Sequence, residues 1–352
     1  MMSLIIPCAG RSSRFQGKPK WLLTCPNGNL MIQEAIKCLN LENIENIYIT
    51  FVKEHIDKYF SKDNIKNLFE NFKNVYITIL EDFTSSQTET VYLTILKNNI
   101  KGGIFIKDCD SYYNHKIEKG NYACSLKICE ENNVSKIYNK SFIESNSLDQ
   151  IIHFCEKKII GDTICVGGYS FKDSSIFTEY YEKCKDTKVE TNEFYISHLI
   201  HFCMLDGKIF YKKDVTNFID WGTPDEWKKY RDSFRTIFLD IDGTIFYNSG
   251  EYLSPKWGET APISGNVDII KSLYSKGRTQ IILTTARKEA YREITEKQLK
   301  KYKIPYDNII FGLFHSKRTL INDFSDTNPY PSALSINLKR DSDDLNVYFN
   351  SN

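Results

Sequence analysis

The sequence predicts an α/β protein of two domains, residues 1–232 and residues 233–352. At 352 residues the chain is long for one average domain and suits two. In both parts, short runs of β-branched and aromatic residues alternate with segments of helical apolar spacing. All ten cysteines lie at or before residue 203, so the composition changes towards the same boundary.

The first domain is predicted to open with a short apolar strand at residues 4–6. The other predicted strands are 47–52, 75–80, 104–106, 122–129, 136–144, 163–171 and 208–211. The predicted helices are 30–39, 88–97, 192–203 and 225–231. Short strands separated by helices favour a mainly parallel sheet covered on both faces. From about residue 121 strands follow one another more closely, as expected for a substrate-binding half.

The second domain starts a new alternation of strands and helices. Its predicted strands are 236–239, 280–283, 308–311 and 319–321, and its predicted helices are 266–276 and 288–302. This order is typical of a doubly wound parallel sheet. We expect the polar tail, residues 340–352, to fray.

Composition and charge narrow the class of partner. The net charge of +1 provides no long-range attraction to nucleic acid or to an anionic membrane. No apolar run approaches the ~18 residues of a membrane span, and the chain lacks a basic start followed by a long apolar region. We therefore expect a cytoplasmic protein, bound to neither nucleic acid nor membrane, with its cysteines reduced and in the core.

A glycine-containing loop and a basic segment follow the first predicted strand. The loop residues are Ala9, Gly10, Arg11, Ser12 and Ser13. Gly10 suits a close turn, after which backbone N–H groups can point at phosphate oxygens. Arg14 and Lys20 add fixed positive charge, whereas Lys18 is equally explained as a solvated surface residue. Phosphoryl and nucleotidyl transfers need such groups because their transition states spread charge over nonbridging oxygens.

These residues resemble the loop and Lys-Pro-Lys segment of the nucleotidyltransferases that make nucleotide-sugars and CDP-choline. The resemblance covers roughly residues 1–230 and implies a Rossmann-like mixed-sheet domain. It implies that Arg14 and Lys20 hold the triphosphate and the attacking phosphate. Ser12 stands where that family usually has a second glycine. CTP is the nucleotide that the resemblance favours, and UTP and GTP remain open.

The same resemblance extends to residues further along the chain. Asp110, after the apolar strand at 104–106, and Asp220 match the family's magnesium ligands, and oxygen-only carboxylate ligands suit Mg²⁺. Gln87 lies where the family reads the base, although a role at a helix start is the alternative. The pair Asp108 and Asp110 also resembles the metal motif of nucleotide-sugar glycosyltransferases, which lack the early Arg14 and Lys20.

The resemblance also implies an acceptor, which is a small phosphorylated sugar or polyol. Gly168 and Tyr169 are similar to the family's sugar-site strand, and Glu193 is a third candidate for substrate binding. A phosphate oxygen of the acceptor is expected to attack the α-phosphorus of the triphosphate, and pyrophosphate leaves. The implied reaction needs no covalent enzyme intermediate.

Two aspartates end the first predicted strand of the second domain. Asp240 and Asp242 are followed by Gly243, which permits a tight turn. Carboxylates two residues apart at a strand end can reach the same phosphate. One can act as a nucleophile while the other gives a proton to the leaving oxygen.

This part of the chain, about residues 235–340, resembles the haloacid-dehalogenase phosphohydrolases. Thr284 and Thr285 match the hydroxyl motif that binds the phosphoryl group. Asp323 matches the acidic motif, so the resemblance implies that Mg²⁺ is held by three aspartates, Asp240, Asp242 and Asp323. Lys317 is our choice for the basic residue, with Arg318 as its competitor, and Asp326 is a further residue that could assist.

Spacing indicates that this domain carries no cap of its own. About forty residues separate Thr244 from Thr284, which leaves no room for a sizeable inserted domain. Water exclusion must then come from the first domain, a neighbouring subunit or a large substrate. Capless members of the family that this domain resembles often oligomerise, so the resemblance implies a homo-oligomer. Together the two resemblances imply a bifunctional enzyme of surface polysaccharide biosynthesis. The alternatives are a glycosyltransferase fused to a phosphatase, and a nucleotidyltransferase whose second domain only senses phosphate.

Overall fold

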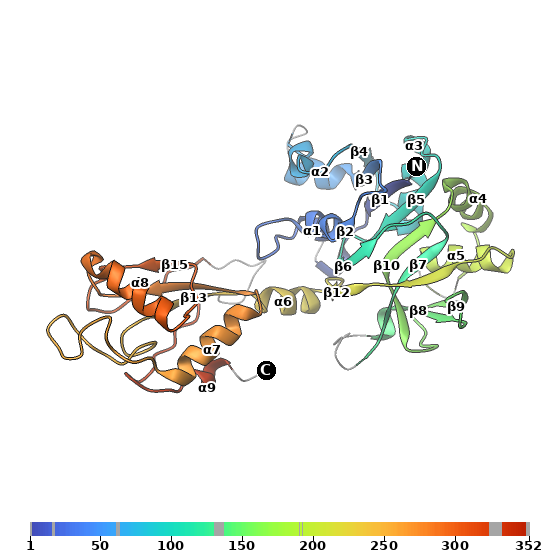
Figure 1. Ribbon diagram of the computed structural model, residues 1–352. Helices are drawn as coiled ribbons and strands as arrows, with labels where there is room; N and C mark the ends of the chain where they lie inside the picture. Colours follow the sequence, from blue (N-terminus) through green and yellow to red (C-terminus); the bar gives the residue numbers. More distant parts are fainter. Residues whose placement is uncertain are drawn as a thin grey trace. The chain divides into compact units, whose positions relative to one another are not determined.

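The computed structural model describes residues 2–15, 18–60, 64–129, 137–189, 191, 193–323 and 333–349. The chain forms two compact units, Met1–Arg231 and Asp232–Asn352. Both contain a sheet with helices packed on it (Figure 1). No helix among the described residues is long and apolar enough to cross a membrane. All ten cysteines are described, and all are free thiols.

A mixed nine-stranded sheet is the centre of the first unit, with the strand order β11-β7-β10-β5-β1-β3-β4 and with β8 and β9 branching from β10. Its strands are β1 (Met2–Cys8), β3 (Asn46–Val52), β4 (Val75–Leu80), β5 (Gly103–Lys107), β7 (Tyr122–Lys127), β8 (Ser141–Ser145), β9 (Ile151–Glu156), β10 (Thr163–Phe171) and β11 (Tyr211–Asp214). Strands β5, β1, β3 and β4 are parallel, whereas β10 runs antiparallel to β5 and β7. The sheet is therefore mixed, as the family resemblance implied, rather than mainly parallel, as the alternation of strands and helices favoured.

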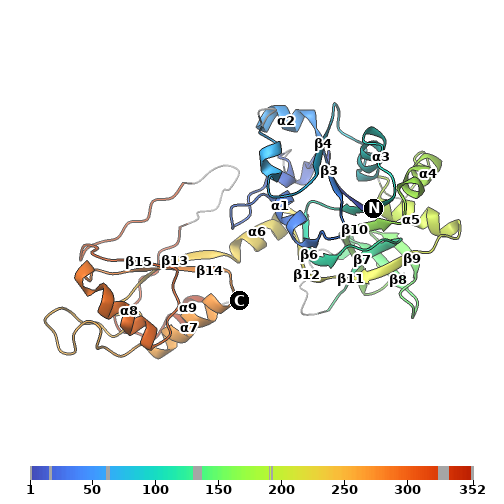
Figure 2. The ribbon, with the colours of Figure 1, turned by 45° about the horizontal axis from the view of Figure 1, so that its top comes forward.

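Helices cover both faces of this sheet, and each face has its own hydrophobic core. The helices of the unit are α1 (Met31–Lys37), α2 (Lys53–Tyr59), α3 (Gln87–Lys97), α4 (Ser174–Cys184), α5 (Ile196–Leu205) and α6 (Pro224–Asp232). Helix α1 and helices α3, α4 and α5 pack on the sheet (Figure 2). Leu4 and Ile6 of β1 enter the core that includes α1, whereas Ile5 enters the core that includes α3, α4 and α5. The alternation follows from the two-residue period of a strand, which sends successive side chains to opposite faces.

A second, small sheet positions the candidate site of this unit. It contains β2 (Leu39–Asn40), β6 (Ser111–Lys116) and β12 (Thr216–Asp220) in the order β12-β6-β2. In the antiparallel pairing of β12 with β6, Asp220 lies opposite Ser111. Two aspartates separated by 110 residues in the sequence, Asp110 and Asp220, are thereby brought to the same end of the sheet.

The second unit contains three parallel strands in the order β13-β14-β15. They are β13 (Arg235–Asp240), β14 (Thr279–Thr284) and β15 (Asn308–Ile310), and the helices are α7 (Ser264–Ser275), α8 (Arg292–Lys301) and α9 (Asn346–Phe349). A core that includes Ile241, Leu283 and Leu299 joins the sheet to the helices. Its resemblance to the haloacid-dehalogenase fold remains a prediction.

Two expectations for the second unit were wrong. The segment at residues 319–321 forms no strand, and its apolar residues Leu320 and Ile321 are exposed. The start of the tail does not fray, because Asp341 N donates to Gly243 O at 2.9 Å and Leu345 is buried in the core. The tail is instead docked beside the loop that carries the two aspartates.

Candidate functional site

The loop after β1 adopts a backbone that a non-glycine residue rarely takes. Ser12 has a φ of 50°, in the left-handed region. Its hydroxyl oxygen accepts a hydrogen bond from Lys20 N at 3.2 Å, which ties the loop to the basic segment. Gly10, Ser13 and Arg14 are exposed, so the loop presents its backbone and a guanidinium group to solvent.

The other loop residues are anchored to the protein. Ala9 is buried in a small core with Val52 and Leu80. Arg11 is exposed, and its guanidinium carbon lies 5.0 Å from the centre of the Phe83 ring. The stacking keeps this cation beside the loop.

Lys20 joins the loop to the predicted metal ligands. Its Nζ lies 2.7 Å from Asp110 Oδ2 and donates a second hydrogen bond to Gly222 O at 3.3 Å. The charge of Arg14 acts on Lys20, which indicates that the two cations lie near each other. Lys20 therefore connects the loop with the ends of β5 and β12.

Carboxylate oxygens converge around Gly222, directly after β12. A Cβ atom at this position would lie 3.1 Å from Asp220 Oδ1, 3.7 Å from Asp110 Oδ2 and 3.9 Å from Glu226 Oε2. Backbone hydrogen bonds hold the arrangement, since Trp221 N donates to Asp110 O at 2.9 Å and Gly222 N donates to Asp220 Oδ1 at 3.0 Å. The remaining oxygen of Asp220 forms an ion pair with Lys140.

The two aspartates at the end of β5 differ in their electrostatics. Burial acts to raise the pKa of Asp110, but the ammonium of Lys20 outweighs it and holds the pKa at about 2. Burial raises the pKa of Asp108 to about 7, and the negative charge of Asp110 adds to the effect. Gln87 Nε2 donates to Asp108 Oδ1. The structure thus pairs Gln87 with Asp108. The role of Gln87 in reading a base stays a prediction.

A fully buried lysine shapes the loop between these aspartates and β6. Lys107 Nζ donates to Asp108 O at 2.7 Å, to Ser111 O at 2.6 Å and to Ser111 Oγ at 2.8 Å. The ammonium also lies 4.4 Å from the centre of the Tyr113 ring. Three acceptors and an aromatic face replace the lost hydration of the charge. Sequence reasoning assigned no role to Lys107, which directly precedes Asp108, and it did not single out Lys140.

The donor set fits Mg²⁺, although the protein supplies only part of a coordination shell. Among the described residues, no three His, Cys, Asp or Glu side chains form a complete metal site. Asp110 and Asp220 supply carboxylate oxygens, which Mg²⁺ prefers, and Mg²⁺ commonly keeps several waters and takes the rest of its ligands from substrate phosphates. Two carboxylates facing the glycine loop meet that requirement.

Of the predicted substrate-binding residues, Gly168 lies opposite Lys107 in the pairing of β10 with β5. A Cβ atom on Gly168 would lie 2.2 Å from Tyr113 Oη, so the residue is packed against the core. Tyr169 is 6% exposed and belongs to a hydrophobic core. Glu193 is exposed. The burial of Tyr169 leaves it little surface for a sugar, and a role of these three residues in substrate binding stays a prediction.

In the second unit, the strand pairing places Asp240 beside Thr284. Arg318 Nη1 lies 2.8 Å from Asp240 Oδ1 and donates a weaker hydrogen bond to Thr284 Oγ1 at 3.4 Å. Burial raises the pKa of Asp240, and the Arg318 guanidinium opposes that rise. Of the two basic candidates, the structure brings Arg318 to Asp240, whereas Lys317 is exposed and makes no ion pair with any described residue.

Asp242 is held by a buried arginine. Arg287 Nη2 and Nε donate to its two carboxylate oxygens at 2.7 and 2.9 Å, and the Arg287 side chain has no exposed surface. Arg287 Nη1 donates to Thr295 Oγ1 and Gln298 Oε1 at 3.0 and 3.1 Å. Nearly all donors of the guanidinium are therefore satisfied. The two hydrogen bonds from Nη2 and Nε fix the orientation of the Asp242 carboxylate.

The remaining predicted residues of this unit are more scattered. Thr285 Oγ1 accepts from Arg287 N at 3.0 Å. Asp323 is exposed, and no hydrogen bond or ion pair joins it to Asp240 or Asp242 within the described ranges. Asp326 lies outside the described residues. The role of Asp323 as a magnesium ligand stays a prediction.

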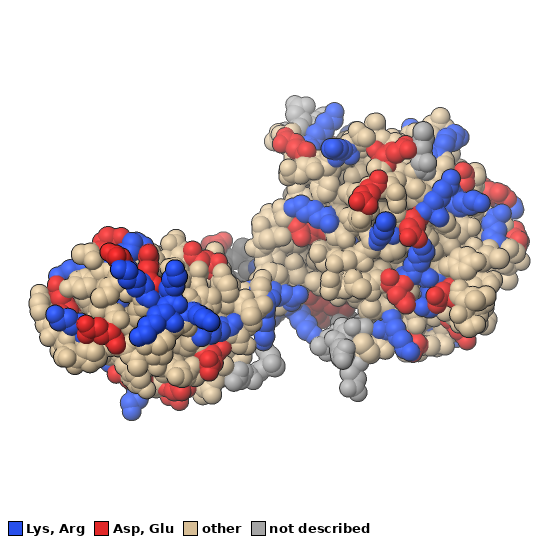
Figure 3. Space-filling model, in the orientation of Figure 1, with Lys and Arg blue, Asp and Glu red and all other residues tan. Residues whose placement is uncertain are grey.

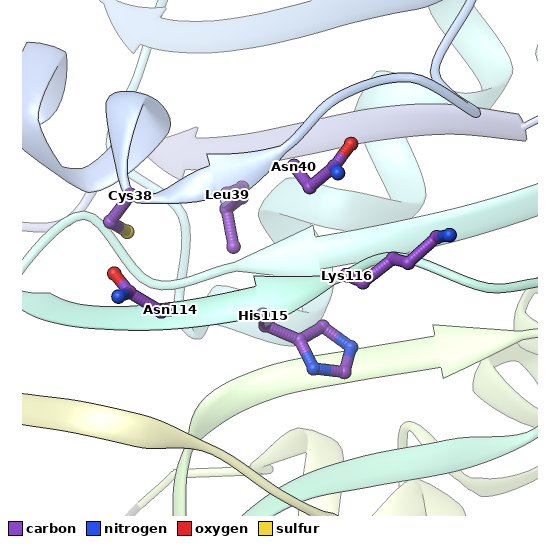
Figure 4. A pocket seen from close by; sticks show the side chains of 6 residues that line it. All are labelled: Cys38, Leu39, Asn40, Asn114, His115 and Lys116. Carbon is purple, nitrogen blue, oxygen red and sulfur yellow. The ribbon is translucent and has the colours of Figure 1, made fainter.

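Two cavities in the first unit lie away from the carboxylate and lysine cluster. One, of about 510 Å³, is lined by Cys38, Leu39, Asn40, Asn114, His115 and Lys116 on and beside β2 and β6 (Figure 4). The other, of about 560 Å³, is lined by Leu41, Ile44, Glu45, Asn46, Ile47, Asn71, Phe72, Lys73 and Asn74.

Acidic and basic side chains are interspersed on the face in Figure 3. Anion binding therefore depends on local groups rather than on a broad field.

The comparisons with known proteins identify the fold of about two thirds of the chain. No family model matches the chain, and no curated protein matches its sequence. A nucleoside-diphosphate-sugar pyrophosphorylase from Vibrio cholerae RC9 is 21% identical, with a TM-score of 0.56 over 65% of this chain and 99% of its own.

Two further solved structures give similar values. A putative glucose-1-phosphate thymidylyltransferase from Bacillus anthracis is 16% identical, with a TM-score of 0.51 over 66% of this chain and 94% of its own. The inositol-1-phosphate CTP transferase from T. maritima is 13% identical, with a TM-score of 0.50 over 65% and 93%. The shared part corresponds in length to the first unit. The chain therefore contains a mixed α/β domain with the fold of sugar-nucleotide and CTP nucleotidyltransferases.

Proposed function

We propose that the first unit transfers a nucleotidyl group from a nucleoside triphosphate to the phosphate of a small sugar or polyol. The observation that carries the proposal is the convergence of Lys20, Asp110 and Asp220 at Gly222, beside the glycine-containing loop. Cations and paired carboxylates at one place are what a reaction between two polyanions requires. The fold is also that of the nucleotidyltransferases in the comparison.

The residues have distinct roles in this reaction. Backbone N–H groups after Gly10 bind triphosphate oxygens, while Arg14 and Lys20 orient the α-phosphate and the attacking phosphate. Asp110 and Asp220 are suited to hold Mg²⁺, which supplies charge neutralisation when it is bound. An acceptor phosphate oxygen bonds to the α-phosphorus as the bond from that phosphorus to the β-phosphate oxygen breaks. Pyrophosphate carries away the electron pair of the broken bond.

The names of two structural neighbours support the class of acceptor. One is named for glucose 1-phosphate and the other for inositol 1-phosphate, which are a phosphorylated sugar and a phosphorylated cyclic polyol. The second is also named as a CTP transferase, which agrees with CTP as our favoured nucleotide. The first is a thymidylyltransferase, so the fold alone does not select the base.

Phosphorus NMR of the full-length enzyme tests this proposal. CTP, UTP, GTP and ATP are each incubated with Mg²⁺ and a panel of sugar, polyol and aminoalcohol phosphates. We expect pyrophosphate and a new nucleotide joined to the acceptor through a diphosphate linkage with at least one pair. Lys20→Met should abolish both signals, whereas Lys183→Met, which removes an exposed ion pair on α4, should preserve them. Release of nucleoside diphosphate from nucleotide-sugars without pyrophosphate would instead favour the glycosyltransferase alternative.

We further propose that the second unit hydrolyses a phosphate monoester. An oxygen of Asp240 attacks the phosphorus as the bond from phosphorus to the leaving oxygen breaks, and Asp242 gives that oxygen the proton with which it leaves as an alcohol. Water then hydrolyses the aspartyl-phosphate, which releases phosphate and restores Asp240. Arg318 and Thr284, which lie beside Asp240, are placed to contact phosphoryl oxygens. On this proposal the chain is bifunctional and supplies activated precursors for surface polysaccharide. A phosphatase acting before activation would remove a second phosphate from a bisphosphorylated sugar.

One observation favours the alternative of a phosphate sensor for this unit. Both oxygens of Asp242 accept hydrogen bonds from buried Arg287, so that carboxylate is already engaged. Phosphate release from a panel of monoesters, compared between the natural chain and Asp240→Asn, separates the two functions. Release that Asp240→Asn abolishes supports the phosphatase. Phosphate binding without turnover in the natural chain supports the sensor.

A further inference from the structure

We propose that Lys140 is a built-in counter-ion that competes with a divalent cation for Asp220, so that metal and nucleotide bind cooperatively. In the free enzyme its ammonium neutralises Asp220. When the triphosphate and its metal ion enter together, the ammonium moves from the carboxylate to a phosphate oxygen. The nucleotide part of this inference rests on the proposed function of the first unit, whereas the competition for Asp220 does not.

The backbone of Lys140 is held at the cluster from both sides. Its N–H donates to Ile137 O at 3.0 Å, and its carbonyl accepts from Lys157 N at 3.1 Å, where β8 meets the end of β9. The side chains of Lys140 and Asp220 are only 19% and 14% exposed. A buried ion pair of this kind resists screening by salt and excludes other cations more effectively than an exposed pair does.

Each of the two carboxylates suited to Mg²⁺ already has an ammonium partner. Lys20 pairs with Asp110, and Lys140 pairs with Asp220. The charges of Glu226, Asp110 and Asp108 attract Lys140, and that of Lys20 repels it. The cluster thus contains two cations among its carboxylates before any metal ion arrives.

This arrangement opposes the binding of a metal ion alone. A divalent cation at Asp220 must displace the ammonium or lie close to a like charge, and both cost free energy in a partly buried site. A triphosphate changes the balance because its oxygens accept the released ammonium. By linkage, whatever the nucleotide adds to metal affinity, the metal adds to nucleotide affinity.

Lys140 is a better subject for a test than Lys20. Lys20 belongs to the basic motif, and its Nζ also binds Gly222 O, so its removal disturbs several contacts. Lys140 makes its ion pair with Asp220 alone among the described carboxylates. Lys140→Met keeps the length of the side chain and removes the charge.

The first experiment measures Mn²⁺ binding to the full-length enzyme by electron paramagnetic resonance, without nucleotide. We expect weak binding to the natural chain and at least about tenfold tighter binding to Lys140→Met, because a like charge a few ångströms away has been removed. Lys140→Arg should bind Mn²⁺ as weakly as the natural chain. The control Lys183→Met, which breaks an exposed pair with Glu179, should leave Mn²⁺ affinity unchanged. Mn²⁺ affinity that is unchanged or lower in Lys140→Met would overturn the inference.

The second experiment needs no variant and adds α,β-methylene-CTP to the natural chain. We expect the analogue to tighten Mn²⁺ binding by at least about tenfold beyond what the analogue in solution explains. In folded Lys140→Met, the analogue should increase the affinity for Mn²⁺ by a smaller factor than in the natural chain. Independent binding of Mn²⁺ and analogue would count against the counter-ion. An analogue that fails to bind at all would contradict CTP as the nucleotide of the proposed function, and the Mn²⁺ titrations would still judge Lys140.

Discussion

At the scale of single residues, Ser12 shows how one side chain offsets the cost of its own backbone. A φ of 50° is unfavourable for any residue with a Cβ. The Ser12 hydroxyl compensates by accepting the hydrogen bond from Lys20 N. The sequence identified Ser12 as a departure from the usual glycine, but only the structure reveals the partner of its hydroxyl. That partner cannot be read from sequence spacing, because the path of the intervening loop decides it.

Substitutions at Ser12 separate the two effects. Ser12→Ala keeps the strained backbone and loses the hydrogen bond, so we expect a loss of about 1 kcal/mol in the free energy of unfolding. Ser12→Gly loses the same bond but relieves the strain, and its stability should stay within about 0.5 kcal/mol of the natural chain. Urea unfolding followed by tryptophan fluorescence measures both, since three of the four tryptophans, Trp21, Trp221 and Trp227, belong to the first unit. Equal stability of the alanine and glycine variants would contradict this account.

His115 is a titratable residue whose pKa is lower in the folded protein than in the unfolded chain. Its ring stacks with Phe105 at a centroid distance of 5.6 Å, and its Nε2 lies 3.0 Å from Tyr122 Oη. Burial lowers its pKa from 6.5 to about 4, and the positive charge of Lys213 contributes. As the pH falls from 6.5 to 4, the unfolded chain takes up a proton that the folded chain does not. The contribution of neutral His115 to the free energy of unfolding is therefore fully present above pH 6.5, and it is lost as the pH falls from 6.5 to 4.

Replacing His115 should flatten this pH dependence. In the natural chain we expect His115 to make the free energy of unfolding rise by about 1 kcal/mol per pH unit between pH 4.5 and 6.5. His115→Phe, which keeps an aromatic ring, should remove that slope. His153→Gln is the matched control, because His153 is exposed and pairs only with exposed Glu144. Unfolding free energies measured at several pH values decide the matter, and an unchanged slope in His115→Phe would refute the assignment.

At the scale of elements, the sequence predicted strands with continuous apolar runs and missed strands whose buried residues are few and separated by polar ones. The runs at β3 and β5 were recognisable from their apolar and β-branched residues, which fill the cores on both faces. Strands β6 and β12 have polar sequences, SYYNHK and TNFID, and exist because they pair with each other. The position of Asp220 beside Asp110 depends on that pairing. A local pattern could not predict it, and only the resemblance suggested it.

The strand expected at residues 319–321 failed for a related reason. A short apolar run becomes a strand only where a neighbour supplies hydrogen bonds, and none of the described strands pairs with this segment. The polar tail behaved in the opposite way. Its backbone and carboxylates bind the loop after β13 and the start of α7, so polar residues can be ordered when they satisfy buried groups.

Asn266 is the main link between α7 and this tail. Its side chain is fully buried, and its Nδ2 donates to Thr244 O and Ser342 O, both at 2.9 Å, while its Oδ1 accepts from Leu345 N at 3.1 Å. One amide thus satisfies three backbone groups from two separate segments. Loss of that amide leaves all three without their partner in a buried site.

Asn266→Ala should therefore loosen the tail. We expect the second unit to lose about 2–4 kcal/mol of stability, since several buried backbone groups are left unsatisfied. Hydrogen exchange with mass spectrometry, which reports each unit separately, should show faster exchange in peptides covering 333–349. Lys300→Ala, at an exposed position of α8, is the control and should change little. Protection of the tail equal to that of the natural chain would show that Asn266 does not anchor it.

At the scale of the whole molecule, the two units were predictable to different degrees. The first combines a loop, a basic segment and two aspartates that the structure gathers at one place, on a fold shared with known nucleotidyltransferases. In the second, Asp240 and Thr284 lie together, but Asp323 does not join them and Arg318 stands where Lys317 was our choice. The order of motifs along a chain predicts well which residues lie at strand ends. The positions of basic and acidic side chains on long loops depend on tertiary contacts, which the order of motifs does not contain.

The two proposed activities should be separable in the full chain. Each unit has its own core, and the residues of each proposed site come from one unit only. Asp220→Asn should therefore reduce pyrophosphate release at least about a hundredfold while phosphate release is unchanged, since the lost carboxylate acts only in the first reaction. Asp240→Asn should have the reverse effect, because an amide is a poor nucleophile. Parallel assays of pyrophosphate and phosphate on the same preparations measure both activities. If either substitution reduced both activities equally in a folded protein, the two reactions would share a site, and assigning one chemistry to each unit would be wrong.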